Sequence, residues 1–219
     1  MSIFSYESRF SQILFRFAYA CILGMFWFVS SVPVFTVGAA TTALYSVMLK
    51  VADNAEGNVI KQYWRAFKEN FKQATQIWLI LLALGIFLGL DLYILTRLRA
   101  ATTGAEAILW TIVLAIVIVA CIVYAVELVY VFPLIARFEN TNRAMMVNAL
   151  LFGVRYLFAT VLVFAIHFAM LVVVVRFFTP ALMFSEGICA WLSSYLLSPV
   201  LRAATGAPDD EAQDAPEER

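Results

Sequence analysis

The chain has 219 residues, of which 63% are hydrophobic and 14% are charged, and its mean hydropathy is +0.88. A soluble domain keeps about a quarter of its residues charged to cover its surface. This composition therefore excludes a soluble globular protein and predicts an integral membrane protein, with the lipid bilayer as its main partner. The formal net charge is zero.

The charges are unevenly distributed along the chain. Residues 203–219 carry six acids against one arginine, which leaves residues 1–202 with fourteen Lys and Arg against nine Asp and Glu. We predict that residues 1–202 form a single helical membrane domain. The acidic tail 203–219 is rich in Ala and Pro and cannot bury a core, so we predict that it is disordered.

Apolar stretches long enough to cross a bilayer recur along the chain. A membrane-spanning helix needs about 20 apolar residues, and four stretches meet this length with few polar interruptions. They are residues 13–32, 74–95, 105–132 and 156–175. A further stretch, 178–200, is long enough but contains Pro180, Ser185 and Glu186. The fold class is therefore all-α, a polytopic helical membrane bundle.

The stretch 34–49 decides the number of spans. As a helix it would extend only about 24 Å, less than the roughly 30 Å of the hydrocarbon core. Gly38, Thr42 and Ser46 recur every four residues, and such a small-residue face lets helix backbones approach closely. We therefore predict a short helix buried between longer neighbours, which gives six spans. The alternative is five spans plus a re-entrant segment at 34–49.

The positions of the basic residues favour six spans. Loops 50–73 and 133–155 hold eight Lys and Arg, and the positive-inside rule places both in the cytoplasm. An even number of spans then puts the N- and C-termini in the cytoplasm, with only Arg97, Arg99 and Arg176 outside. We predict a multi-pass protein of the bacterial plasma membrane.

The segment 60–73 is predicted to be an amphipathic helix on the cytoplasmic side. Aromatic side chains follow a helical spacing along it, and basic side chains follow the same spacing on the neighbouring face. Such a helix suits the headgroup layer of the membrane, and it could also dock a partner protein. The candidate docking residues of this segment are Tyr63, Trp64, Arg65, Phe67, Lys68, Phe71 and Lys72.

A second candidate docking region follows the span 105–132. Pro133 lies near the cytoplasmic end of that span, where the loss of one backbone hydrogen bond has little effect. Arg137 and Glu139 form a small charge cluster after it. Asn140 or Thr141 is a suitable cap for a further helix that runs to Arg155.

Three motifs resemble those of a known family. The sequence "PVFTVGAATTALY", then "YWRAFKENFKQAT" and later "YVFPLIARFENT", are similar to the YesL family of bacterial integral membrane proteins, and the likeness covers roughly residues 10–200. The resemblance implies a membrane protein without an established activity. Members are often encoded beside carbohydrate transporters of the ATP-binding cassette (ABC) type and two-component sensor kinases, which implies these as partners.

Ionisable residues inside the spans are candidate functional groups, because hydrocarbon disfavours them strongly. Glu127, His167 and Glu186 lie within predicted spans. Consecutive spans usually pack together, so we expect His167 and Glu186 to pair at one depth. Such a pair can pin two helices, relay protons or bind a polar solute. Glu127 lies closer to the cytoplasmic side and is expected to meet Arg16 or Arg137.

Enzyme, cofactor and metal sites are not predicted. The sequence contains no nucleophile elbow, zinc-protease motif or phosphate-binding loop, its single histidine argues against multi-histidine metal sites, and its three cysteines are isolated. The basic segment 60–73 is tied to the bilayer at both ends, which also argues against nucleic acid binding. The leading expectation is a non-catalytic accessory or regulatory component of a carbohydrate uptake or sensing system. The alternatives are a small transporter or permease subunit and a membrane-organising protein.

Overall fold

A computed structural model describes residues 9–176 and 179–205, and in this part of the chain every regular element is helical. The elements are α1 (Arg9–Ser30), η1 (Val34–Thr36), α2 (Val37–Ala52), α3 (Val59–Ala101), α4 (Gly104–Arg137), α5 (Asn142–Arg155), α6 (Leu157–Arg176), η2 (Thr179–Ala181) and α7 (Leu182–Thr205). The predicted all-α membrane bundle is confirmed. Most of the predicted acidic tail lies outside the described residues, and residues 203–205 belong to α7.

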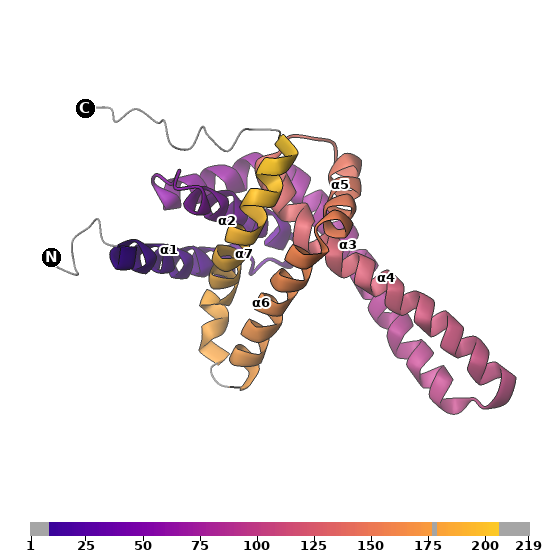
Figure 1. Cartoon of the computed structure of the whole chain (residues 1–219). Helices are drawn as coiled ribbons and strands as arrows, with labels where there is room; N and C mark the ends of the chain where they lie inside the picture. The colour runs from indigo at the N-terminus through magenta and orange to yellow at the C-terminus, as the bar shows by residue number, and fades with distance from the viewer. Residues whose placement is uncertain (1–8, 177–178, 206–219) are drawn as a thin grey trace, which may run out of the picture.

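Within residues 9–176 and 179–205, five helices are long and apolar enough to cross a bilayer. These segments are Phe10–Ser30, Val34–Ala52, Val59–Ala101, Gly104–Arg137 and Leu157–Arg176. The predicted sixth span, 178–200, falls mainly in η2 and α7. Helix α7 is not among the five candidate spans. Its serines and Glu186 reduce its apolar character, and Ser193 and Ser194 are buried against protein. In the part of the chain that the structure describes there are thus five candidate spans. Helix α7, which returns beside α6 in a hairpin (Figure 1), is the helix that would complete the predicted six.

Helix α2 lies at the centre of the fold, between α1, α3, α4 and α7 (Figure 1). Its span is 67% buried, whereas the other four candidate spans are between 11% and 22% buried. The prediction of a short helix buried between longer neighbours is confirmed. The re-entrant alternative is not what the structure shows, because α2 is an unbroken helix from Val37 to Ala52.

The predicted amphipathic helix 60–73 is not a separate element, because it is the first part of the 43-residue helix α3. Asn58 caps the start of α3 by accepting a hydrogen bond from the Lys61 backbone N–H (3.0 Å). The segment between this cap and the span 74–95 contains neither Gly nor Pro to end the helix. Its buried positions, Tyr63, Ala66, Ala74 and Ile77, follow one continuous helical face.

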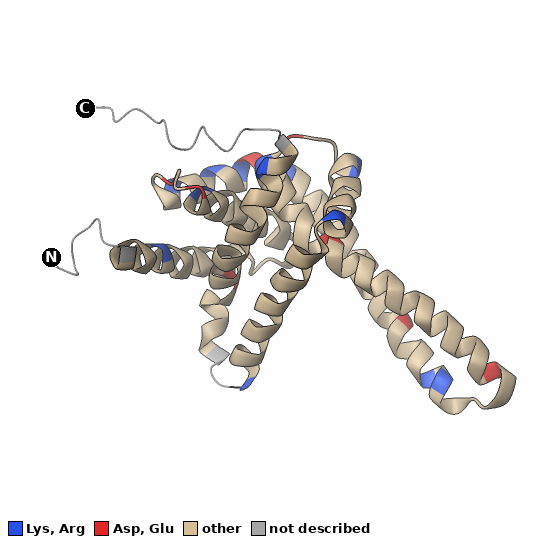
Figure 2. Ribbon diagram, in the orientation of Figure 1, with Lys and Arg blue, Asp and Glu red and all other residues tan. Residues whose placement is uncertain are grey.

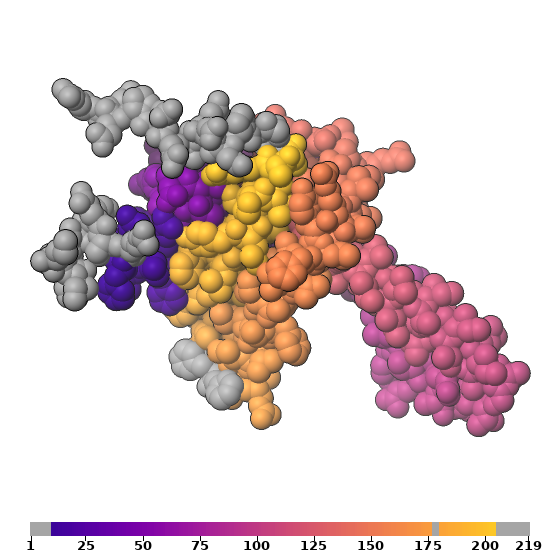
Figure 3. Space-filling view, in the orientation of Figure 1, coloured from indigo at the N-terminus to yellow at the C-terminus, as the bar shows by residue number. Residues whose placement is uncertain are grey.

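The second half of α3 and the first half of α4 form a hairpin that stands clear of the other helices (Figure 3). Its outer surface is apolar, with exposed side chains such as Ile86, Phe87, Ile116 and Ile122. A surface of this kind is stable when hydrocarbon surrounds it. Helices α6 and α7 form a second hairpin that points away from the same end of the bundle (Figure 1).

The helix predicted after residue 140 is confirmed as α5. Thr141 is its N-cap and accepts a hydrogen bond from the Ala144 backbone N–H (3.4 Å). Pro133 lies inside α4, which continues only as far as Arg137.

Candidate functional sites: a polar groove and an aromatic-lined cavity

The two segments predicted to dock a partner line one polar groove of about 640 Å³. One wall comes from the first part of α3, and the other from the end of α4 and the residues that follow it. The side chains predicted for docking that line it are Arg65, Arg137 and Glu139. Lys50, at the end of α2, and Ser46, the last residue of the small-residue face, line it as well. We call this surface the docking groove.

Polar contacts hold the two walls of the docking groove together. The Gln73 side-chain amide donates a hydrogen bond to the Asn140 carbonyl oxygen at 2.7 Å. The Asn142 amide donates to the Gln76 side-chain oxygen at 3.0 Å. These bonds join α3 to the residues after α4, so the groove has fixed walls.

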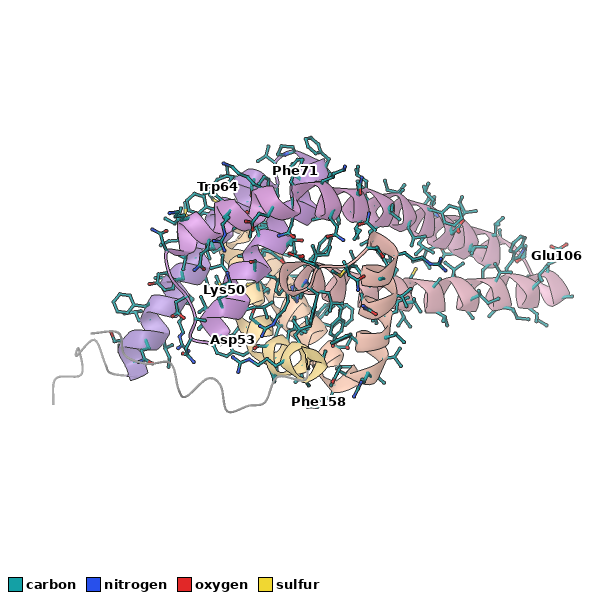
Figure 4. All side chains as sticks on the ribbon, turned by 90° about the horizontal axis from the view of Figure 1, so that it is seen from above. Lys50, Asp53, Trp64, Phe71, Glu106 and Phe158 are labelled. Atoms are coloured by element: carbon teal, nitrogen blue, oxygen red, sulfur yellow. The ribbon has the colours of Figure 1, made fainter. Side chains whose placement is uncertain are left out.

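Aromatic side chains lie beside the groove on the outer face of α3. Trp64 and Phe71 are exposed, by 38% and 37%, and Figure 4 shows both on the outer side of the helix. Phe67 lies between them and is half-buried, with its ring 5.7 Å from that of Trp64 and 5.5 Å from that of Phe71. These rings form a continuous apolar strip.

Tyr63 does not belong to this exposed strip. It is fully buried, its hydroxyl forms a 2.6 Å hydrogen bond with the Ser30 hydroxyl, and its ring lies 6.0 Å from that of Phe26. Tyr63 thus joins α3 to α1 and cannot touch a partner, which corrects its assignment as a docking residue.

The basic side chains of this segment remain on the surface. Arg65, Lys68 and Lys72 are all exposed. Arg65 lies 3.7 Å from Glu69, but both side chains are more than 60% exposed, and a surface pair of this kind contributes little to stability. The positive charges of α3 are therefore available to an anionic surface or partner.

Arg137 has an internal role as well as a place in the groove. Its guanidinium lies 2.7 Å from one carboxylate oxygen of Asp53, and the Arg202 guanidinium lies 2.8 Å from the other. The Ser198 hydroxyl also donates to Asp53. Asp53 is the C-cap residue of α2, so one carboxylate joins the C-terminal ends of α2, α4 and α7. We call this the Asp53 cluster.

A neighbouring contact ties α1 to the same end of the bundle. The Arg16 guanidinium donates to the Asn54 side-chain oxygen and, at 2.9 Å, to the Tyr195 hydroxyl. Asn54 has a left-handed backbone with φ of 56°, which Asn tolerates better than most residues. The turn after α2 therefore connects α1, α2, α4 and α7.

His167 and Glu186 are brought together, as the sequence predicts. The His167 Nε2 atom lies 3.9 Å from a carboxylate oxygen of Glu186, and both side chains are mostly buried. They line a cavity of about 290 Å³ near the middle of the bundle, together with side chains from α1, α2, α3 and α4. Five of its twelve lining residues are Trp, Tyr or Phe: Trp27, Tyr45, Trp78, Phe132 and Phe164. We call this the aromatic cavity.

Hydrogen bonding fixes which ring nitrogen of His167 carries a proton when the ring is neutral. The Nδ1 atom of His167 lies 2.8 Å from the Val163 carbonyl oxygen, and a carbonyl only accepts, so Nδ1 carries a proton. In a neutral His167, Nε2 then has a lone pair and can only accept a hydrogen bond. An ionised Glu186 carboxylate can also only accept, so the two groups would face each other as acceptors. One proton held by either group removes this conflict and leaves the pair with no net charge.

Glu127 does not join the other two intramembrane residues. It is 4% exposed and borders a different, apolar groove between α3, α4 and α5. Neither of its oxygens has a hydrogen-bond partner among the described residues. The expected contact with Arg16 or Arg137 is wrong, because Arg16 binds Asn54 and Arg137 binds Asp53. The three residues do not line one path.

Glycines allow several close helix contacts, including one between α2 and α3 and one between α1 and α7. At Gly38, an added Cβ atom would lie 2.5 Å from the Cβ of Trp78 and 2.6 Å from the Ala74 carbonyl oxygen, so α2 meets α3 there. Thr42, on the same face, is fully buried. The second contact, between Gly24 of α1 and Gly187 of α7, was not predicted, although both glycines stand out within apolar stretches.

The Asp53 cluster and the aromatic wall were also not predicted. Asp53 looks like an ordinary turn residue in the sequence, because its partners are 84 and 145 or more positions away. Trp27 and Trp78 lie inside apolar stretches, where an aromatic residue is usually part of the packing. In the described part of the chain, no group of three His, Cys, Asp or Glu side chains is arranged to hold a metal ion.

Comparisons with known proteins give a family and a relative without an assigned activity. Residues 17–92 match the model of a family described as "Protein of unknown function, DUF624". The chain is also similar to the uncharacterized protein YteU of Bacillus subtilis (strain 168), with 29% identity over 163 residues, which are 74% of this chain and 70% of that protein. No solved structure matches.

The matched residues 17–92 include most of α1, all of α2 and most of α3. They therefore contribute to both the docking groove and the aromatic cavity. The comparisons do not confirm the YesL family by name. The matched family is of the same kind, because it too has no assigned function. The chain is a helical membrane protein, part of which is similar to a family of unknown function.

Proposed function

We propose that this protein is an accessory or regulatory component of a bacterial carbohydrate uptake or sensing system, without catalysis of its own. The observation that carries this proposal is the docking groove. Two segments that the sequence marks separately as docking regions are 60–73 and 137–150, and residues of the first and residues 137–140 of the second line one groove with fixed walls. The carbohydrate system is what the resemblance to the YesL family implies.

The proposed partner is the membrane permease of a carbohydrate ABC transporter or a two-component sensor kinase. A partner of this kind lies in the same bilayer, so it can meet the aromatic strip of Trp64, Phe67 and Phe71 at the membrane surface. The groove next to the strip offers both signs of charge, from Lys50, Arg65 and Glu139. A polar groove beside an apolar strip matches the rim and core of protein interfaces.

The proposal places the docking groove on the cytoplasmic side of the plasma membrane, together with both ends of the chain. Support comes from the Asp53 cluster, which joins the ends of α2, α4 and α7 at one end of the bundle. In Figure 2, Lys and Arg gather around the first part of α3, α5 and the end of α7, and others mark the hairpin tips. An excess of basic residues at one end is the pattern of a cytoplasmic face.

Affinity purification from native membranes in mild detergent, followed by mass spectrometry, tests the docking role. We expect a carbohydrate permease or sensor kinase to co-purify with the wild-type chain. The double variant Trp64→Ala/Phe71→Ala should reduce its recovery at least tenfold, because exposed aromatic residues dominate interface energies. Lys68→Glu, which reverses an exposed charge on α3, should weaken the association further.

The matched control is Phe158→Ala. Phe158 is 79% exposed on α6 and lies on the opposite side of the molecule from Trp64 and Phe71 in Figure 4. Recovery of the partner with this variant should equal that with the wild type. Equal recovery with the double variant and the wild type would show that the aromatic strip docks nothing.

A transporter or permease subunit is a second candidate function. The aromatic cavity favours it, because a histidine–carboxylate pair inside a bundle is typical of intramembrane polar sites. Glu127 lies apart from this cavity, which counts against a continuous path lined by Glu127, His167 and Glu186. A transporter would also move its ligand across vesicles that contain this chain alone, which the accessory role does not require.

A further inference from the structure

We propose that the aromatic cavity is a binding site for a small organic cation with an alkylammonium group. The cavity of about 290 Å³ is close to the lower size limit of small-molecule sites. This inference is independent of the docking groove, and it supplies a ligand class for the second candidate function.

The walls of the cavity have the chemistry that recognises an ammonium group. Aromatic faces attract cations through their negative π surfaces, most strongly for tryptophan. Trp27 and Trp78 contribute two indole rings, and the Phe132 ring lies 6.3 Å from that of Trp78. Glu186 adds one carboxylate to this otherwise mostly apolar lining. An aromatic cage with a single acid matches one positive charge carried on an alkyl body.

Both indoles are fixed in place by their own hydrogen bonds. The Trp27 Nε1–H donates to the Thr41 hydroxyl at 2.9 Å, and the Trp78 Nε1–H donates to the Val34 carbonyl oxygen at 2.7 Å. These bonds orient the rings before any ligand enters. They also occupy the donors that a sugar ring would need, so a neutral polyhydroxyl ligand finds few free partners in this cavity.

The cation would replace the proton of the His167–Glu186 pair. Without a ligand, one proton keeps the pair free of net charge. When an ammonium group binds the Glu186 carboxylate, a neutral His167 with its proton on Nδ1 completes a site that again has no net charge. The proton leaves to solvent, so binding of one cation releases about one proton. This exchange avoids an uncompensated charge within the bundle.

The other titratable groups around Glu186 are few. Three of them interact with the charge of Glu186: Tyr45 from α2, His167 from α6 and Cys189 from α7. The residues that α1, α3 and α4 contribute to the cavity are not titratable: Trp27, Trp78, Ala125, Leu128, Val129 and Phe132. Among the described lining residues, His167 is therefore the natural proton partner of Glu186.

Isothermal titration calorimetry of the full chain in detergent tests this site with choline as the probe. The neutral molecule 3,3-dimethylbutan-1-ol has the same shape without the charge and serves as the control ligand. We expect saturable binding of choline at one site and none of the alcohol. Titrations in buffers of different ionisation enthalpy should show the release of about one proton per choline near pH 7.

Two variants connect the signal to the cavity. Glu186→Gln should weaken choline binding at least tenfold, whereas Glu139→Gln, at the docking groove, should bind like the wild type. Phe164→Leu removes one aromatic face at a position that is 36% exposed and should weaken binding about two- to fivefold. Phe164→Leu keeps the test valid if Glu186→Gln fails to fold.

The absence of saturable choline binding to the wild type would overturn the proposal. Equal binding of choline and the alcohol, or of wild type and Phe164→Leu, would do so as well. Choline binding without proton release would contradict the exchange with the His167–Glu186 pair. None of these outcomes bears on partner recovery through the docking groove, so the two proposals fail separately.

Discussion

Gly187→Ala is expected to destabilise the protein by about 3 kcal/mol, the upper end of the usual range for overpacking. A Cβ atom at Gly187 would lie 2.0 Å from the Ala20 carbonyl oxygen and 2.8 Å from the Cα of Gly24. Both are backbone atoms of α1 and cannot rotate away as a side chain would. Helices α1 and α7 must therefore separate, and their contact joins the N-terminal helix to the bundle.

Thermal unfolding in detergent, followed by near-UV circular dichroism, measures this effect. Gly89→Ala is the matched control, because an added Cβ at Gly89 meets nothing within 4 Å. It should raise the stability slightly, since alanine favours a helix over glycine by about 0.5–1 kcal/mol. Similar unfolding temperatures for the two variants would show that α1 and α7 do not pack at Gly187 in this way.

Asp53→Asn is expected to lower the free energy of unfolding by about 2–3 kcal/mol near neutral pH. Loss of one partner from a fully buried ion pair costs about 3–5 kcal/mol. The value here is smaller because the side chains of Arg137 and Arg202 are 25% and 31% exposed. Asparagine keeps the shape of Asp53 but cannot neutralise two guanidinium groups. The ends of α2, α4 and α7 should therefore loosen together.

The effect of this substitution should depend on pH. Asp53 lies outside the five candidate spans. Burial raises its pKa, but hydrogen bonds from Ser198, Arg137 and Arg202 and the Arg137 charge together lower it below its ordinary value of 3.8. A carboxyl group with a depressed pKa in the folded state stabilises the fold above its unfolded pKa, and this stabilisation disappears as the pH falls through its folded pKa.

The stability difference between the wild type and Asp53→Asn should therefore be constant above about pH 5 and shrink below about pH 4. Denaturation curves of both proteins across this range measure it. Asp91→Asn is the control, since Asp91 forms no ion pair within residues 9–176 and 179–205. A difference that persists unchanged well below pH 4 would contradict the role of the Asp53 carboxylate.

Local patterns in the sequence predicted the helices well, because hydrophobic length and capping residues act over short distances. The capping of α5 by Thr141 and the buried position of α2 follow from such patterns. The continuity of α3 through residues 73 and 74 was missed, since the change from amphipathic to fully apolar sequence suggested a boundary. In the structure one buried face runs through this change, from Tyr63 to Ile77.

A contact between distant residues was predicted only where two ionisable residues lie in neighbouring apolar stretches and can pair with each other. His167 and Glu186 are the ionisable groups deepest in two consecutive apolar stretches, so their pairing followed from depth. Asp53 had many possible basic partners, and the sequence does not indicate that Arg137 and Arg202 end their helices at the same place. The aromatic cavity depends on six helices, and no single pattern marks it.

The proposed role depends above all on the orientation of the α3–α4 hairpin, which is expected to cross the bilayer with the docking groove on the cytoplasmic side. Single cysteines at Lys68 and Glu106, in a chain whose three cysteines are replaced by alanine, test it directly with a membrane-impermeant maleimide on intact bacteria. Glu106 lies at the tip of the hairpin (Figure 4). We expect labelling of Glu106→Cys on intact cells and of Lys68→Cys only after permeabilisation. Labelling of both positions from the same side would contradict it.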